Sequence, residues 1–536
     1  MSILVLLPVI LLLFTALAIA VIRQVRPGYG YTWLLGTGLA LVVWVLMLVL
    51  HWQNLSAFSL LAWRPSGGFL AALTFQLDQA SWQYAFGLVG LLAAVILTAP
   101  SRLRQEITPF SWVGGMIMTS AGVLASMAVT PLALIMAWTI IDVMDLGIIL
   151  ATEDNEQYDW RSVIALAVRV GGTILVVWTL IVSHSQGELL MLTNVLPENG
   201  IYLLLAAGLR LGVIPLHLPY APDVKLRRGF GTIFRMVASA SSLVVLGRLP
   251  ATAVAPAWSP YLAIVTAFVA FYGAIMWASA KNALAGRPYW MIALAAMAIA
   301  CVLRGQPQAS AAWGVALILS GGVIFLFSAW RPEWLVLLAL GALGLSGLPY
   351  SPGASGWLGL IKSPLDFLDL IYLLAHSLLM LGYLRHGLGQ GRLGEEESER
   401  WLQIIYPTGL LLMLATQWLI GIFGWPGSFT LGMWWPGTAS LLLAVVGFVL
   451  LRWRGSSSPA EAGNRPWFLA LADRVGKILG AFFRLEWLYQ VFGFLFRLAQ
   501  TTVGFVALIL EGEGGVLWAL MLMVLLISLI RPGVNP

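Results

Sequence analysis

Long runs of apolar residues alternate with short polar segments along almost the whole chain. Each run has roughly 20 residues, the length that an α-helix needs to cross the ~30 Å hydrocarbon core of a bilayer. Window hydropathy therefore predicts about 16 transmembrane helices. The predicted spans are residues 3–22, 32–50, 80–99, 110–128, 131–151, 162–183, 200–220, 231–248, 259–279, 288–303, 310–329, 333–349, 366–384, 404–423, 436–452 and 515–531. The predicted fold class is an all-α polytopic membrane protein.

The seventh predicted span contains a cation followed by a helix-breaking residue. Arg210 lies in the middle of this span, and Pro215 follows it by about one and a half helical turns. A proline removes a helical hydrogen bond, and inside a bilayer the freed backbone groups must be satisfied by protein or water. Such breaks often mark an ion or substrate site. The alternative is a packing kink with Arg210 paired to a neighbouring acid.

The composition agrees with a membrane location. Of the 536 residues, 60% are hydrophobic and only 10% are charged, whereas soluble proteins carry about 25% charged residues. The first apolar run is not predicted to be a cleavable signal peptide, because no basic residue precedes it, no small-residue cleavage site follows it, and many more spans come after it. The net charge of +6 is attributed to basic cytoplasmic loops and not to nucleic-acid binding.

Residues that hold metals and cofactors are scarce. The single cysteine, Cys301, cannot form a disulfide within the chain or hold an iron–sulfur cluster, which needs several thiolates. The five histidines include no pair three or four positions apart, the spacing that a metal or haem site on one helix would use. We therefore predict no cofactor, no metal and no catalytic redox site in this chain. Any redox or nucleotide chemistry would belong to a partner.

The distribution of basic residues predicts an orientation. If the N-terminus lies outside and the helices alternate, most loop arginines and lysines fall on the inside, Arg228 and Arg287 among them. The outside loops then hold only Arg64, Arg248, Arg304, Lys362 and Arg531. This asymmetry follows the positive-inside rule. We predict a multi-pass protein of the inner (cytoplasmic) membrane with its N-terminus outside.

Four segments are predicted along the chain. Residues 1–453 form the transmembrane helix bundle, and residues 454–465, rich in glycine and serine, form a flexible linker. In residues 466–514, charges recur at roughly helical spacing among aromatic residues and leucines, as in an amphipathic helix that lies along the membrane surface. Residues 515–536 form a C-terminal transmembrane helix.

Few ionisable residues lie inside the predicted spans. A charged group at membrane depth costs at least about 2.5–3.5 kcal/mol, so each one is a candidate for function. Asp142 and Asp145 are three positions apart and share one face of the fifth span; a structural pair with Arg169 or Arg210 is the alternative. The candidates for ion translocation are Asp142, Asp145, Arg169, Arg210, His217, Arg235 and His376.

Several short motifs resemble one family of membrane subunits. Residues 206–217, Ala-Ala-Gly-Leu-Arg-Leu-Gly-Val-Ile-Pro-Leu-His, resemble a stretch of the antiporter-like subunits of respiratory NADH dehydrogenase (complex I), membrane-bound hydrogenases and multisubunit cation/proton antiporters. Residues 77–81 resemble the family's Leu-Asp-Gly-Leu-Ser, and residues 169–172 its Arg-Val-Gly-Asp, with Gly172 at the Asp position. Residues 347–349 match the Gly-Leu-Pro of its broken twelfth span, which implies a second helix break at Pro349. The surface helix and last span resemble the lateral arm of the largest subunits.

The resemblance implies a row of proton-relay residues that this chain only partly retains. In the family, a glutamate on the fifth span pairs with a lysine on the seventh. Here Thr139 stands at the glutamate position, Asp142 follows one turn later, and Arg210 stands at the lysine position. Arginine stays protonated at every physiological pH, whereas a buried lysine can take up and release a proton.

The other relay lysines are absent as well. On the eighth span Arg235 stands at the usual histidine position and Ala240 at the lysine position. Gly321 and Gly322 stand where the lysine of the tenth or eleventh span is expected. The four lysines of the chain all fall outside the middle of the predicted spans: Lys225, Lys281, Lys362 and Lys477.

Three functions are compatible with these patterns. The first is a membrane subunit that couples proton or Na⁺ movement to the reaction of an oxidoreductase-type complex, using Asp142 and the broken seventh helix. The second is a degenerate, non-pumping scaffold subunit of the same fold that docks and stabilises partner subunits. The third, an unrelated solitary transporter or membrane-embedded enzyme, is disfavoured by the ordered motifs. The predicted partners are other membrane subunits, the lipid bilayer and protons or Na⁺, and not nucleic acid.

Overall fold

A computed structural model describes most of the chain as two compact units. The units comprise Met1–Ser458 and Pro459–Pro536. The described residues are 2–53, 55–63, 71–102, 109–152, 160–220, 228–328, 332–389, 400–425, 427–431 and 433–456, with short stretches between 490 and 524.

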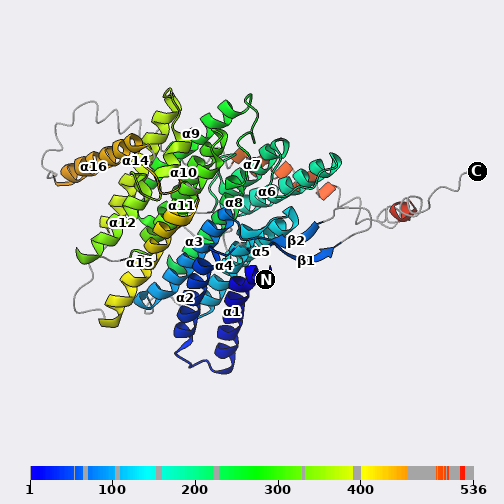
Figure 1. Ribbon diagram of the computed structural model, residues 1–536, viewed down its shortest axis with the longest axis horizontal. Helices are drawn as coiled ribbons and strands as arrows, with labels where there is room; N and C mark the ends of the chain where they lie inside the picture. Colours follow the sequence, from blue (N-terminus) through cyan, green and yellow to red (C-terminus); the bar gives the residue numbers. More distant parts are fainter. Residues whose placement is uncertain are drawn as a thin grey trace, which may run out of the picture. The chain divides into compact units, whose positions relative to one another are not determined.

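The first unit is a bundle of apolar helices (Figure 1). The helices are α1 (Leu7–Val25), α2 (Thr32–Leu50), α3 (Gln79–Thr98), α4 (Pro109–Met127), α5 (Pro131–Thr152), α6 (Trp160–Ser185), α7 (Pro197–Leu211), α8 (Arg228–Gly247), α9 (Ser259–Ser279), α10 (Ala283–Leu303), α11 (Ser310–Leu326), α12 (Leu335–Ser346), α13 (Ala354–Leu360), α14 (Phe367–Leu388), α15 (Arg400–Phe423) and α16 (Trp434–Ser456). Every predicted span up to residues 436–452 corresponds to one of them. Among the described residues, 11 helices are long and apolar enough to cross a membrane. The predicted fold class is therefore confirmed, and the count of about 16 spans stays a prediction.

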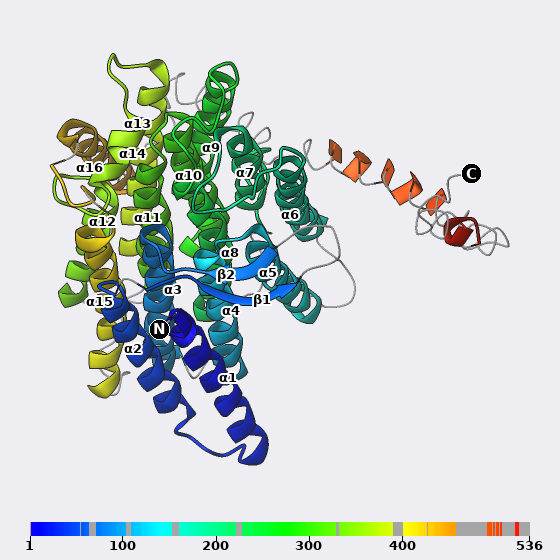
Figure 2. The ribbon, with the colours of Figure 1, turned by 45° about the vertical axis from the view of Figure 1, so that its right-hand side comes forward.

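The core of the bundle consists of helices that are buried on all sides. Helices α3, α10 and α11 are almost wholly enclosed by the others. The surrounding helices leave large apolar side chains uncovered, among them Phe14 on α1, Val143 on α5 and Ile174 on α6, each more than half exposed. Such faces suit contact with lipid chains. Helices α5, α6 and α7 lie on one side of the bundle and α12, α14 and α16 on the other (Figure 2).

Several helices begin at a side chain that caps their first turn. The carboxylate of Asp78 accepts a hydrogen bond from the Ser81 amide at the start of α3, at 2.7 Å. At α14, Asp366 and Asp369 form a capping box, in which each side chain accepts from the other residue's backbone amide. These caps satisfy amide groups that a helix start would otherwise leave without a partner.

The two predicted helix breaks are confirmed, but the first lies earlier than expected. Helix α7 ends at Leu211, because Gly212 adopts a left-handed conformation (φ 77°) three residues before Pro215. Residues 212–220 are irregular, so the predicted helical span 200–220 is wrong in its second half. Helix α12 likewise ends at left-handed Gly347 (φ 68°), two residues before Pro349. Glycine tolerates this conformation because it has no Cβ.

A β-hairpin that the sequence analysis did not predict joins α2 to α3. Strands β1 (Phe58–Trp63) and β2 (Ala71–Phe75) pair antiparallel, with an irregularity near Leu60. The amide of Val129, in the turn between α4 and α5, donates to the Thr74 carbonyl at 2.9 Å, and the Val129 carbonyl accepts from the Leu192 amide at 2.7 Å. Backbone hydrogen bonds therefore tie the hairpin to the ends of α4, α5 and the segment before α7.

In the second unit, the described residues between 490 and 505 and from 520 to 524 are helical. Val491, Phe494, Leu498 and Phe505 are each about half exposed or more. The predicted linker, surface helix and last transmembrane span fall largely outside the described residues, so their boundaries stay predictions.

Candidate functional site: a buried cluster of aspartates and arginines

Four consecutive helices bring together five of the predicted site residues. Asp142 and Asp145 come from α5, Arg169 from α6, Arg210 from α7 and Arg235 from α8, and none is more than 6% exposed. The three-residue spacing on α5 turns both carboxylates toward the same side, as predicted. The cluster is thus an enclosed group of charges.

Asp142 and Arg210 form a two-pronged ion pair at its centre. The two terminal nitrogens of Arg210 donate to the two carboxylate oxygens of Asp142 at 2.7 and 2.9 Å. One of them also donates to the Arg169 carbonyl at 3.1 Å and to the Thr173 hydroxyl at 3.2 Å. The guanidinium carbon lies 4.2 Å from the centre of the Trp138 ring, a cation–π distance. Planar, bidentate pairing of this kind fixes both side chains.

Asp145 is bound by two further arginines. Its carboxylate accepts from Arg235 at 3.0 Å and pairs with Arg169 on its other oxygen. Arg169 also lies 3.7 Å from Asp142, so it links the two aspartates. Both carboxylates in the cluster are therefore held by groups that keep their positive charge.

A glycine on α6 makes room for the arginine on α7. A Cβ atom at Gly172 would lie 2.7 Å from Cγ of Arg210 and 2.8 Å from the carbonyl oxygen of Ala206. The neighbouring Gly171 has nothing within 4 Å of that position. The absence of a side chain at Gly172 thus lets the long Arg210 side chain pass between the helices.

His217 lies in the irregular segment after α7 and is fully buried. Its Nδ1 donates to the Pro215 carbonyl at 3.0 Å, an assignment that follows because a carbonyl can only accept. Its Nε2 has no hydrogen-bond partner among the described residues. Three positions later, Tyr220 places its ring 3.9 Å from the guanidinium carbon of Arg235. The broken end of α7 therefore packs against the cluster.

His376, the remaining candidate, lies apart from the cluster on α14. Its Nε2 donates to the carbonyl of Leu345 at 3.0 Å, just before the break in α12, and its Nδ1 is 2.9 Å from the Ser440 hydroxyl. The rings of Trp313 and Trp357 pack against it at 5.4 and 4.9 Å. Both ring nitrogens are thus engaged, in hydrogen bonds that join α14 to α12 and α16.

Gly321 and Gly322, where the resemblance implies a lysine, each face a large side chain of a neighbouring helix. A Cβ at Gly321 would lie 2.5 Å from the indole nitrogen of Trp290, and a Cβ at Gly322 would lie 2.6 Å from the sulfur of Met413. Trp290 donates to the Leu317 carbonyl at 3.1 Å, which fixes its ring in this place. A side chain at either position would therefore require Trp290 or Met413 to move.

Two solved structures have the same fold. The first is a chain of the Mrp complex from Dietzia sp. DQ12-45-1b, with a TM-score of 0.68 and 17% sequence identity. The match covers 94% of this chain but only 63% of the Mrp chain, so this chain spans less than two thirds of that protein's length. The second is a chain of the membrane-bound sulfane sulfur reductase, an archaeal respiratory membrane complex, with a TM-score of 0.65 and 14% sequence identity. This match covers 97% of this chain and 100% of the other. This chain has the antiporter-like fold. No protein-family model and no curated protein sequence matches it.

Within this antiporter-like fold, one buried arginine was misplaced by the sequence analysis. Arg287 was predicted in an inside loop, but it lies in the first turns of α10 and is only 4% exposed. Its guanidinium carbon is 5.4 Å from the Phe325 ring centre. The charge count along the sequence could not reveal this, because the burial depends on how α8 and α11 pack against α10.

A second ion pair of the antiporter-like fold lies at the start of α3. Arg248 donates to both carboxylate oxygens of Asp78, at 3.1 and 3.0 Å, and to the carbonyls of Ser126 and Ala128 at 2.9 and 2.7 Å. Burial by itself would raise the pKa of Asp78. The positive charge of Arg248 and the hydrogen bonds from Arg248 and Ser81 outweigh it, so this pKa lies below its ordinary value. The pair joins the beginning of α3 to the ends of α4 and α8.

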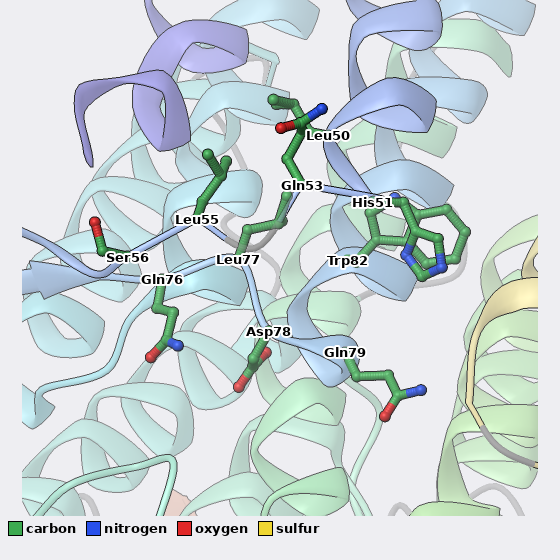
Figure 3. Close-up of a pocket in the computed structure, with 10 residues that line it drawn as sticks. All are labelled: Leu50, His51, Gln53, Leu55, Ser56, Gln76, Leu77, Asp78, Gln79 and Trp82. Carbon is green, nitrogen blue, oxygen red and sulfur yellow. The ribbon is translucent and has the colours of Figure 1, made fainter. Parts of the chain in front are cut away.

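A cavity of about 520 Å³ lies where α2 ends and α3 begins (Figure 3). Its lining includes His51 and Trp82, whose ring centres are 4.0 Å apart with the planes tilted by 35°, and the side chains of Gln76 and Asp78. The volume is in the range of small-molecule pockets. The cavity shares no residue with the charged cluster. Among the residues that the structure describes, no group of three histidine, cysteine or acidic side chains could hold a metal ion.

Proposed function

We propose that the chain is a membrane subunit of a multisubunit complex, in which the buried charges hold helices α5 to α8 together and do not pass protons along the bundle. The observation that carries this proposal is the Asp142–Arg210 pair, since both carboxylate oxygens are bound by a group that stays protonated. The packing of Trp290 against Gly321 and of Met413 against Gly322, where the resemblance implies a lysine, supports it further.

A role among partner subunits is supported by the fold. The two similar chains come from a complex in each case, the Mrp complex and the sulfane sulfur reductase. We propose that the predicted surface helix in residues 466–514 contacts such partners. We also propose that the chain lies in the cytoplasmic membrane with its N-terminus outside, as the basic residues indicate.

Translocation of protons or Na⁺ is a second candidate. It is favoured by the position of the cluster beside the broken end of α7, where the buried Nε2 of His217 has no partner among the described residues. In this case Asp142, Asp145, Arg169, Arg210, Arg235 and His217 would line the ion path, and His376 would belong to a separate part of it.

Flux measurements distinguish the two candidates. The complex, purified in gentle detergent with its partner subunits, is reconstituted into vesicles with dyes that report pH and Na⁺. A structural cluster predicts that any ion flux of the assembled complex is the same with Asp142→Asn as with the control Thr139→Val, an exposed residue of the same helix. Loss of flux in Asp142→Asn, with assembly intact, would favour translocation.

Co-purification tests the scaffold role directly. Deletion of residues 466–536 is expected to release partner subunits that the full chain retains. A full chain that purifies alone as an active monomer would contradict a place in a complex.

A further inference from the structure

The break in α12 leaves backbone carbonyls that the helix itself cannot satisfy. In an uninterrupted helix the Leu345 carbonyl would accept from the amide four residues further on. That residue is Pro349, which has no N–H. The Ser346 carbonyl would accept from Tyr350, whose amide instead donates to the Thr430 carbonyl at 2.9 Å. Both carbonyls therefore need donors from other parts of the bundle.

The break in α7 is closed differently. There the amides of Gly212 and Val213 both donate back to the Gly208 carbonyl, the second of them at 3.0 Å. Such backbone bonds are common where a helix ends at a left-handed glycine. Just after α12, by contrast, the Leu348 amide donates to the Ser346 hydroxyl at 3.3 Å, and the next residue is a proline.

Side chains from α14 and α13 supply the two donors at the end of α12. Nε2 of His376 lies 3.0 Å from the Leu345 carbonyl. The indole N–H of Trp357 lies 3.4 Å from the Ser346 carbonyl. His376 is completely buried, and the Trp357 ring packs against it with 4.9 Å between the ring centres. The two donors therefore hold each other in place.

Helix α16 also contacts the break. A Cβ atom at Gly437 would lie 2.6 Å from the carbonyl oxygen of Gly347, so the start of α16 packs directly against it. The Ser440 hydroxyl is 2.9 Å from Nδ1 of His376, and the Gly437 carbonyl is its alternative acceptor at 3.0 Å. Because the Leu345 carbonyl can only accept, Nε2 of His376 carries hydrogen, and Nδ1 of the neutral ring then accepts from the hydroxyl.

We infer that His376 is a positioning residue that maintains the break in α12 by supplying the hydrogen bond that Pro349 cannot. A proline stands at the position of the missing amide, a buried donor lies within hydrogen-bond distance of the Leu345 carbonyl, and a second hydrogen bond orients the ring. This role accounts for both ring nitrogens. It goes beyond the proposed function, which concerns the charges of α5 to α8, and does not depend on it.

The test is hydrogen–deuterium exchange of the purified full chain in detergent, measured by mass spectrometry of peptides that cover residues 343–356. Amide exchange reports local opening of the structure. In His376→Leu these amides are expected to exchange about tenfold faster than in the wild type, because a buried carbonyl loses its donor. His376→Gln, which retains an N–H donor at the end of its side chain, should bring the rate back toward the wild-type value.

His386→Leu is the matched control on the same helix. Nε2 of His386 also lies 3.0 Å from a carbonyl, that of Trp277, but this carbonyl additionally accepts from the Ala280 amide at 3.2 Å. The variant should therefore leave the exchange of residues 343–356 unchanged. Equal acceleration in both leucine variants would show a general loosening around α14 and would overturn the assignment.

Nitrogen-15 spectra of histidine-labelled wild-type protein are a second readout, which stands even if His376→Leu does not fold. The His376 signal, identified by its loss in His376→Gln, should show hydrogen on Nε2. Nε2 without hydrogen, an unchanged exchange rate in His376→Leu, or a His376→Gln protein that exchanges as fast as His376→Leu would each contradict this role.

Discussion

The side chain of Arg210 occupies the space into which any side chain at Gly172 would extend. The separation between a Cβ at Gly172 and Cγ of Arg210 would be 2.7 Å, below any ordinary contact. A Cβ there would also lie 2.8 Å from the backbone oxygen of Ala206, so the close packing of α6 against α7 requires glycine at this position.

Gly172→Ala is accordingly expected to destabilise the fold by about 1–3 kcal/mol, the usual cost of overpacking. The adjacent Gly171→Ala is the matched control, because a Cβ there meets nothing within 4 Å. Reversible unfolding in detergent measures both. Equal stabilities of the two variants would show that α6 and α7 can separate to accept a methyl group.

The aspartate–arginine pair at the centre of the cluster should behave as a coupled unit. Asp142→Asn or Arg210→Gln alone is expected to cost about 3–5 kcal/mol, because each leaves one buried charge without its partner. The double variant should be more stable than the sum of the single effects predicts, by about 0.5–3 kcal/mol. Additive losses in this double-mutant cycle would mean that the two side chains contribute independently.

Trp290 packs against Gly321, so a lysine at this position, which the family resemblance implies, should destabilise the fold. Gly321→Ala is expected to cost about 1–3 kcal/mol through contact with the Trp290 indole. Gly321→Lys should cost more, because it adds a longer, charged side chain at a buried position. Gly147→Ala on α5, where nothing lies within 4 Å, is the control. A Gly321→Lys protein as stable as the wild type would contradict the closed packing between α10 and α11.

Stability should fall in acid through Asp78. The pKa of Asp78 is lowered in the folded state, so its ion pair with Arg248 contributes fully above the unfolded value of about 3.9. That contribution disappears as the pH falls from there through the folded pKa. The unfolding midpoint between pH 6 and pH 3 should therefore drop less in Asp78→Asn and in Arg248→Gln than in the wild type. Parallel curves for all three proteins would contradict this role.

The apolar runs alone were sufficient to predict most of the helices. The bounds of α2 and α9 agree with the predicted 32–50 and 259–279, because an uninterrupted apolar run determines where a spanning helix begins and ends. The end of α7 was missed, because the decisive residue is left-handed Gly212 and the prediction relied on Pro215. The breaking effect of a glycine depends on the conformation that the fold imposes.

The β-hairpin and the burial of Arg287 could not be predicted from local patterns. Strands β1 and β2 are short, and their stability comes partly from hydrogen bonds to distant residues such as Val129. For the candidate site, charge and helical spacing predicted that Asp142 and Asp145 share a face, and pairing with Arg169 or Arg210 was one stated alternative. The sequence did not predict that His376 lies apart, since that separation follows from the order of the helices in space.

The excess of buried arginines has an electrical consequence. Among the described residues of α5 to α8 and α10, four buried arginines and two buried aspartates leave a net positive charge. One elementary charge moved across a membrane potential of 100 mV changes its energy by about 2.3 kcal/mol. When the membrane is energised, its electric field therefore exerts a force on the helices that carry this net charge, and this force scales with voltage.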